Sequence, residues 1–311
     1  GRCSSTEKLF HTIYSQIIVS SVNYKKIIVA PLNWGLGHAT RCVPIVHALI
    51  ENKAEVILAS DGNALAFLEK EFPLFKKIRL PDSNIKYYRF LPAWLSISLQ
   101  FPKFIYQLRC DKIFIEKYLK KNQVDVILSD NRYGFRSKKV KSILITHQLQ
   151  IISGFFGCIP NLIIQKLVSK FNYCLIPDFE PYEESLAGKL SHPSKITNQI
   201  FYIQALSRFT FSNQAPISSL VPVIISGPNP MKLKILNKLI EVLANTNDHF
   251  IIISGDATKQ ESKQIGNIKI VSHLETAQFE KIISESRYII STGGYSSIMD
   301  FYGLNKKIIF I

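Results

Sequence analysis

Paired cysteines, long apolar runs and acidic side chains are all scarce in this sequence. Its five cysteines lie far apart, without a Cys-x-x-Cys pair and without a nearby histidine at metal-ligand spacing. We therefore expect no metal site, and we expect reduced thiols, as in a cytoplasmic protein. No stretch reaches the roughly 18 uninterrupted apolar residues of a membrane-spanning helix, so none is expected.

Acidic residues number 23 against 38 lysines and arginines, which gives a formal charge of +15. Such an excess attracts phosphates, nucleic acid or an anionic membrane without selecting one of them. The lysines are scattered at the ends of predicted elements, and the basic runs with interleaved aromatic residues that are typical of nucleic-acid-binding proteins are missing. No nucleic-acid partner is expected.

Apolar residues, in contrast, make up 47% of the 311 residues, a proportion that predicts a globular protein with two separate cores. Apolar runs such as IIVA and VILA have no polar face, which is typical of a parallel sheet covered on both sides. Predicted strands are 26–30, 55–59, 77–80, 124–130, 142–148, 173–177, 221–227, 249–255, 267–272, 288–292 and 307–311. Helices are predicted at 41–52, 64–72, 97–121, 161–171, 231–244, 277–286 and 296–302.

This alternation predicts an α/β protein with two doubly wound, Rossmann-like parallel-sheet domains that face each other across a cleft. Residues 24–200 would form the N-terminal domain and 201–311 the C-terminal domain, after a tail of uncertain status at residues 1–23. The segment 178–215, rich in Pro, Ser and Asn, is interpreted as the connection. Because Ile311 lies inside the last predicted strand, we expect the second domain to be incomplete at its C-terminus.

The first predicted strand runs directly into NWGLGHATR. Ligands of parallel sheets bind beyond the carboxyl ends of the strands, where a glycine turn before a helix presents N–H groups to an anion. Gly35 and Gly37 permit close backbone approach, and His38 can donate or accept a proton there. A tight turn capped by Thr40 is one alternative. A dinucleotide-binding turn with Asp61 as its ribose acid is another, although Thr40 stands where that turn needs Gly or Ala.

A second glycine turn, STGGYSSIMDFYG, lies between a strand and a helix of the second half. Gly293 and Gly294 open the backbone, while Ser296 and Ser297 supply hydroxyls and helix capping. Asp300 is placed on the first turn of the helix, where its carboxylate could hold two ribose hydroxyls or simply stabilise the helix N-terminus.

Together the two turns resemble the GT-B glycosyltransferases, most closely family 28 and its MurG-type N-acetylglucosaminyltransferases. The first-domain loop of that family is glycine-rich and carries a histidine, matched here by Gly35, Gly37 and His38. Its second-domain signature runs from a glycine to an acid six positions on, matched by Gly294 and Asp300, although the MurG enzymes carry Glu there. The resemblance implies that this acid binds the donor ribose.

The segments SDNRYG and ITHQL resemble an uncharacterised bacterial MurG-like group, and both follow strands of the first domain. Asp130, Asn131, Arg132 and His147 are therefore expected on the acceptor side of the cleft, with Arg132 as a bidentate phosphate ligand. A solvated loop and a structural role for His147 are the alternatives.

The resemblance implies transfer of a sugar from a nucleotide donor, expected to be a UDP-sugar, to an acceptor hydroxyl, with inversion and without metal or cofactor. His38 is the expected general base or phosphate contact. Expected donor contacts are Gly35, Gly37, Ser226, Gly227, Gly293, Gly294, Tyr295, Ser296, Ser297 and Asp300. A sugar-nucleotide epimerase, a non-catalytic nucleotide-sugar-binding protein and, more distantly, a dinucleotide-dependent oxidoreductase are the alternatives.

Two apolar stretches, 94–108 and 151–167, are flanked by Lys103, Arg109 and Lys166. They belong either to the core or to a peripheral contact with the inner face of the membrane, as in enzymes that act on lipid-linked acceptors. The acceptor is expected to be lipid-linked or a polysaccharide, and the protein to be cytoplasmic.

Overall fold

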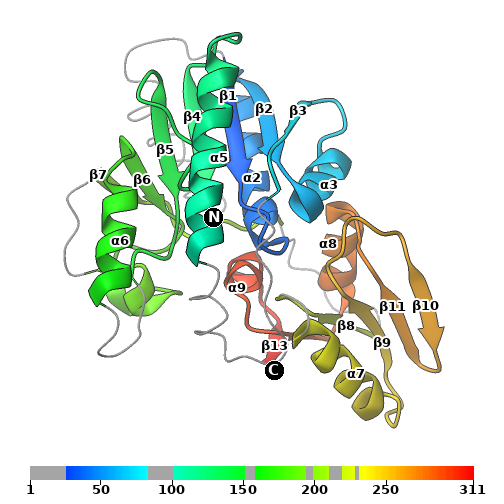
Figure 1. The fold of residues 1–311 in the computed structure, drawn as a ribbon. Coiled ribbons are helices and arrows are strands. Elements are labelled where there is room, and N and C mark those ends of the chain that lie inside the picture. Colours follow the sequence, from blue (N-terminus) through cyan, green and yellow to red (C-terminus); the bar gives the residue numbers. More distant parts are fainter. Residues whose placement is uncertain (1–25, 83–100, 151–157, 194–198, 210–218, 228–230) are drawn as a thin grey trace.

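The computed structural model describes residues 26–82, 101–150, 158–193, 199–209, 219–227 and 231–311. The predicted tail at 1–23 and the parts of the apolar stretches at 94–100 and 151–157 lie outside these ranges. The described residues form two β-sheets, each with helices on both faces (Figure 1).

The first sheet consists of seven parallel strands in the order β3-β2-β1-β4-β5-β6-β7. These strands are β1 (Lys26–Pro31), β2 (Glu55–Ser60), β3 (Lys76–Arg79), β4 (Val126–Asp130), β5 (Lys141–Ile145), β6 (Tyr173–Ile176) and β7 (Gln199–Tyr202). The chain changes direction across the sheet between β1 and β4. The carboxyl ends of these two strands therefore flank the crevice where doubly wound folds bind ligands.

Successive residues of β1 face opposite sides of the first sheet, as the pleat requires. Ile27 and Val29 pack in the core under α2 (Gly37–Glu51) and α3 (Gly62–Glu71), whereas Ile28 and Ala30 pack in the core under α5 (Phe101–Leu119). The α6 helix (Cys158–Val168) packs beside β5 and β6. Two short 3-10 helices, η3 (Tyr182–Glu184) and η4 (Gly188–Leu190), follow β6.

The second sheet has six strands in the order β10-β11-β9-β8-β12-β13, all parallel except for the antiparallel pair β10–β11. They are β8 (Leu220–Ile224), β9 (His249–Ile253), β10 (Ser262–Ile265), β11 (Ile268–Val271), β12 (Tyr288–Ser291) and β13 (Lys307–Phe310). The α7 helix (Met231–Leu243) covers one face, and α8 (Thr276–Glu285) and α9 (Tyr295–Phe301) cover the other.

The α9 helix joins the two halves. It lies next to α2 in Figure 1, and Met299 of α9 is fully buried in the same hydrophobic core as Ile27 and Val29 of β1. Phe209, just beyond the first sheet, packs in the core of the second sheet. The two halves therefore share buried apolar surface as well as polar contacts.

The predicted architecture is confirmed, with three differences of detail. The α2 helix begins at Gly37 rather than at residue 41, with Leu36 at the N-cap position. The strand β7 lies within the predicted connection and pairs with β6 as an edge strand. The strand β10 was not predicted at all, and three of its four residues are exposed. None of the helices in the described ranges is long and apolar enough to cross a membrane.

Candidate functional site

A cavity of about 320 Å³ lies between the two halves. The first half contributes the turn after β1 and the residue that follows β5, and the second half contributes the turns after β8, β9 and β12. The lining includes Trp34, Gly35, Gly37, His38, Arg41, His147, Ser226, Gly227, Gly294, Tyr295, Ser296, Ser297 and Asp300. Thus the structure brings both predicted glycine turns to one cavity.

The turn after β1 leads directly into the N-terminus of α2. Gly35 has φ +76°, a conformation that side-chain-bearing residues rarely adopt. Leu36 at the N-cap makes no side-chain capping bond, and the first turn of α2 contains no acidic residue. The positive end of the helix dipole is therefore left without a negative partner on its own first turn, an arrangement that favours an anion.

Two glycines allow close approach between turns rather than unusual backbone angles. A Cβ atom at Gly37 would lie 2.4 Å from the Oγ atom of Ser296, across the boundary between the halves. A Cβ atom at Gly294 would lie 2.5 Å from the Oγ atom of Ser226, within the second half. Gly293, in contrast, has open space around its Cα.

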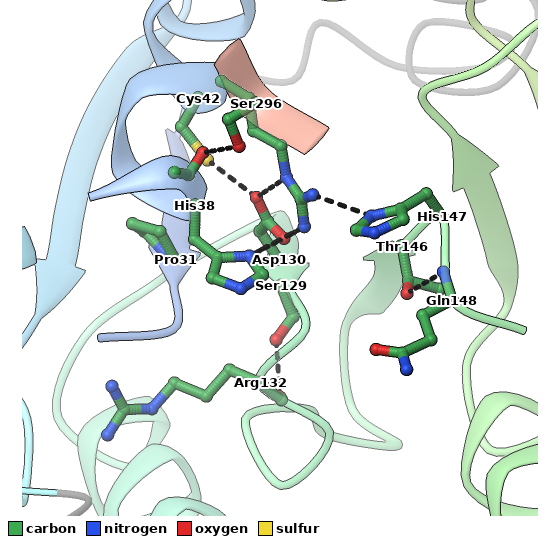
Figure 2. Close-up of polar contacts among 12 residues, drawn as sticks. Pro31, His38, Cys42, Ser129, Asp130, Arg132, Thr146, His147, Gln148 and Ser296 are labelled. Carbon is green, nitrogen blue, oxygen red and sulfur yellow. Dashed lines mark hydrogen bonds and ion pairs between the residues drawn. The ribbon is translucent and has the colours of Figure 1, made fainter. Parts of the chain in front are cut away.

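His38 and Asp130 point toward each other at the crevice between β1 and β4 (Figure 2). Arg41 joins them in a compact network. The Nε atom of Arg41 donates to Asp130 Oδ2 at 2.5 Å, and its Nη2 atom pairs with Asp130 Oδ1. The Nδ1 atom of His38 lies 3.0 Å from Asp130 Oδ1 and 2.8 Å from Arg41 Nη2. His38 and Arg41 are three residues apart on α2, so they project from the same helix face.

The buried network has one dominant charge state. Burial alone would raise the pKa of Asp130, but the charges of Arg41 and His38 outweigh burial and lower that pKa to about 2. Burial and the positive charge of Arg41 lower the pKa of His38, although Asp130 opposes them. At neutral pH the network therefore contains a carboxylate, a guanidinium and a neutral imidazole.

His147 follows β5 and lies on the other side of the same guanidinium. Its Nδ1 atom is 3.1 Å from Arg41 Nη1, and its ring stacks on Tyr295 with centroids 3.9 Å apart and an interplanar angle of 16°. Burial and the charge of Arg41 lower the pKa of His147 to about 3, so it is neutral. Tyr295 belongs to the second half, and its hydroxyl donates to the carbonyl of Pro177 at 2.6 Å.

On the second half, Ser226 is held beside the second glycine turn. Its N–H donates to Thr292 Oγ1 at 2.8 Å, and the two hydroxyl oxygens are 2.7 Å apart. Gly227 has φ +104°, a conformation that favours glycine. The two predicted donor loops thus meet at a hydrogen-bonded pair of hydroxyls.

Asp300 lines the cavity but sits in the second turn of α9, not the first as expected, because the helix begins at Tyr295. Its carboxylate pairs with Arg208 Nε at 3.2 Å and accepts from the Arg208 N–H at 3.2 Å. Burial raises the pKa of Asp300, and Arg208 opposes that rise. A carboxylate offers about four lone pairs, so these two contacts leave room for two further donors.

The structure does not support the expected role of Arg132 as an acceptor ligand. Its side chain is fully buried and does not line the cavity, because it forms ion pairs with Asp61 and Asp111. Asp61 accepts hydrogen bonds from Arg132 and Asn33 and makes no helix-capping bond of its own. It therefore does not take the place of the acid that would bind a ribose in a dinucleotide-binding site. Asn131 has φ +53° and does not line the cavity either.

Asp130 also takes a different place from the one predicted. It is fully buried and reaches the cavity only through His38 and Arg41. Of the four predicted acceptor-side residues, only His147 lines the cavity.

Several lining residues were not predicted. Arg41 is the last residue of the motif NWGLGHATR, and its position one helical turn after His38 was the available signal. Asn63, Arg208, Lys232 and His273 also line the cavity, and no motif identified them. Within the described ranges, no group of three or more His, Cys, Asp or Glu side chains is arranged to hold a metal ion.

A scan against models of known protein families finds no match, and a search of curated proteins finds none either. Solved structures are similar in fold. The glycotransferase of kitacinnamycin has a TM-score of 0.58 and 13% identity, over 92% of this chain and 80% of that one. UGT89C1 of Arabidopsis thaliana has a TM-score of 0.57 and 14% identity, over 89% of this chain and 76% of that one.

A third similar structure is UGT2 of Phytolacca americana, in complex with UDP-2fluoro-glucose and pterostilbene. It has a TM-score of 0.56 and 12% identity, over 92% of this chain and 80% of that one. UGT89C1 has also been solved with UDP and with UDP-L-rhamnose. The chain therefore has the GT-B fold, in which two doubly wound domains face each other across a cleft.

Proposed function

We propose that this protein transfers a sugar from a UDP-sugar to a hydroxyl group of an acceptor, as an inverting enzyme of the family 28 type that needs no metal. One observation carries the proposal. A neutral histidine, His38, lines the cavity between two GT-B halves while its Nδ1 atom contacts a buried carboxylate, Asp130. That pairing is what a general base requires.

His38 acts as the base in the tautomer whose Nδ1–H donates to Asp130, because the Nε2 atom is then free to accept a proton. Nε2 of His38 takes the proton of the acceptor hydroxyl as that oxygen forms a bond to the anomeric carbon. The bond from the anomeric carbon to the diphosphate breaks, and UDP leaves with the electron pair. Attack from the face opposite the diphosphate inverts the anomeric carbon. The lowered pKa of His38 keeps it unprotonated at neutral pH.

The donor nucleotide lies between the two glycine turns in this proposal. The uncapped N-terminus of α2 faces the cavity and favours the diphosphate, with the backbone at Ser226, Gly227 and Gly294 on the other side. Asp300 holds the ribose hydroxyls with the lone pairs that Arg208 leaves available. Residues 24–200 would then carry the acceptor side, and residues 201–311 the donor side.

The acceptor enters from the first half, beside His147, and is lipid-linked or a polysaccharide. The first alternative requires contact with the inner face of the membrane. Supporting features are the exposed apolar side chains of Phe101 and Ile113 on α5, which also carries the exposed cations Lys103 and Arg109, and that of Leu162 on α6.

The test is release of UDP from a panel of UDP-sugars, with and without a membrane extract as the source of acceptor. Transfer predicts release that depends on the extract and is lost, by a factor of at least about 100, in His38→Ala. Thermal unfolding of His38→Ala should match that of the wild type. Conversion of the sugar nucleotide without an acceptor would identify an epimerase and refute the proposal, as would full turnover by His38→Ala.

A further inference from the structure

One guanidinium contacts the Nδ1 atoms of two histidines in the cavity wall. Arg41 Nη2 lies 2.8 Å from His38 Nδ1, and Arg41 Nη1 lies 3.1 Å from His147 Nδ1 (Figure 2). Both histidines line the same cavity. Their second ring nitrogens, the Nε2 atoms, have no hydrogen-bond partner among the residues that the structure describes.

The protonation of His147 follows from the chemistry of its partner. A guanidinium only donates hydrogen bonds, so Nδ1 of His147 must carry the lone pair and accept from Arg41. Because the ring is neutral, its one proton is then on Nε2. His38 differs, because its Nδ1 atom lies near both Arg41 Nη2, at 2.8 Å, and a carboxylate oxygen of Asp130, at 3.0 Å, and the carboxylate can accept a proton from Nδ1. Hence His147 presents a hydrogen-bond donor to the cavity, whereas His38 can present an acceptor.

The orientation of the His147 ring is fixed from both halves of the protein. Arg41, on α2, holds the ring edge, and Tyr295, on α9, covers the ring face at a centroid distance of 3.9 Å. The hydroxyl of Tyr295 is anchored on the carbonyl of Pro177 in the first half. The stack therefore depends on the contact between the two halves.

We propose that His147 donates a hydrogen bond from Nε2 to the diphosphate of the bound nucleotide, with Arg41 and Tyr295 as positioning residues. This rests on the proposed function for the identity of the anion. Tyr295 directly follows Gly294, so the His147 ring lies beside the glycine turn expected to face the diphosphate. A neutral N–H donor at this place strengthens its bond as negative charge grows on the leaving oxygen, and it needs no proton from solvent.

The tautomer is tested first, because this measurement does not depend on any substrate. Long-range ¹H–¹⁵N correlation spectra of protein labelled in histidine nitrogen distinguish a protonated Nε2 from a protonated Nδ1. We expect the Nε2–H form for His147, and a protonated Nδ1 on that ring would overturn the proposal. Spectra of His147→Phe assign the signal, since only that resonance disappears.

Nucleotide binding is tested second, by titration with UDP and with uridine. His147→Phe keeps an aromatic ring on Tyr295 but removes the N–H, so UDP affinity should fall at least about tenfold while uridine affinity is unchanged. His147→Gln can place an amide N–H where Nε2 was and should restore most of the loss. The matched control is His47→Phe, an exposed histidine of α2 outside the cavity.

Equal UDP affinity of His147→Phe and the wild type would overturn the diphosphate contact. An equal loss for UDP and uridine would overturn it too, because the defect would then not concern the phosphates. If the wild type binds no UDP, the proposed function fails and the diphosphate contact with it, while the spectra still report on the pairing of Arg41 with His147.

Discussion

The hydroxyl of Ser296 donates a hydrogen bond to the carbonyl oxygen of Gly37 at 2.9 Å, so the first turn of α9 touches the first turn of α2. A Cβ atom on Gly37 would lie 2.4 Å from the Ser296 Oγ atom, closer than real Cβ contacts come. The absence of a side chain at Gly37 is therefore what lets the two halves meet at the cavity.

Gly37→Ala should hold the two halves apart and lower UDP affinity. Alanine favours helix more than glycine does, so a loss cannot come from weaker helix formation. Ser296→Gly in the same chain removes the atom that clashes and should recover the affinity. Gly293→Ala is the control, because Gly293 does not line the cavity and nothing lies within 4 Å of the Cβ it would add. Unchanged UDP affinity in Gly37→Ala, measured by calorimetry, would show that this contact does not control closure.

The ion pair between Arg41 and Asp130 is fully buried, so removing either side chain leaves the charge of the other buried without its partner. Asp130→Leu leaves Arg41 unpaired and should cost about 3–5 kcal/mol in the free energy of unfolding. Adding Arg41→Met removes the stranded charge, so the double variant should be more stable than Asp130→Leu alone. Urea denaturation measures all three proteins.

An exposed ion pair supplies the comparison for that experiment. The Nζ atom of Lys238 and the Oε2 atom of Glu241, both on α7, are 3.0 Å apart, and both side chains are mostly exposed. Glu241→Ala should therefore change the free energy of unfolding by less than about 1 kcal/mol. If Asp130→Leu were as mild as Glu241→Ala, Arg41 and Asp130 would not form the buried pair described above.

Stability should fall as the pH drops from about 6.5 toward 4, because His38, His147 and His273 resist protonation in the folded state. Burial, together with nearby positive charges, lowers the pKa of His147 to about 3 and that of His273 to about 4. Below the ordinary histidine pKa the unfolded chain takes up protons that the folded chain refuses, and this favours unfolding. Above pH 7 both states are neutral at these sites, so the effect is absent.

Melting temperatures recorded across that pH range test the effect. His147→Phe removes one of the three groups and should make the decline shallower. An equal slope in His147→Phe and the wild type would contradict a neutral, buried His147.

The fold was predictable because strands without a polar face are typical of parallel sheets covered on both sides, and such strands recur along both halves. Two strands, β7 and β10, were not predicted, and each has a physical reason. The strand β7 is an edge strand in a segment rich in polar residues and proline, so its short apolar run was assigned to the connection between the two domains. The strand β10 has the sequence SKQI and is mostly exposed, which leaves almost no apolar pattern.

The site was predictable in position but not in detail. Glycine turns that follow parallel strands must lie at the carboxyl edge of their sheets, so their meeting at one cavity followed from the pattern. The direction of the Arg132 side chain could not be predicted from the sequence. It forms ion pairs with Asp111, 21 residues earlier on α5, and with Asp61, 71 residues earlier, and these hold it away from the cavity. The pairing of His38 with Asp130 joins residues 92 positions apart, and only the arrangement of β1 beside β4 reveals it.

Titration calorimetry with UDP, and with NAD for comparison, tests the central claim most directly, because it asks whether the cavity between the halves recognises a nucleoside diphosphate. The wild type should bind one UDP per chain, bind NAD far more weakly, and lose at least about tenfold in UDP affinity in Asp300→Ala. Preference for NAD, or UDP binding that Asp300→Ala leaves unchanged, would contradict the account.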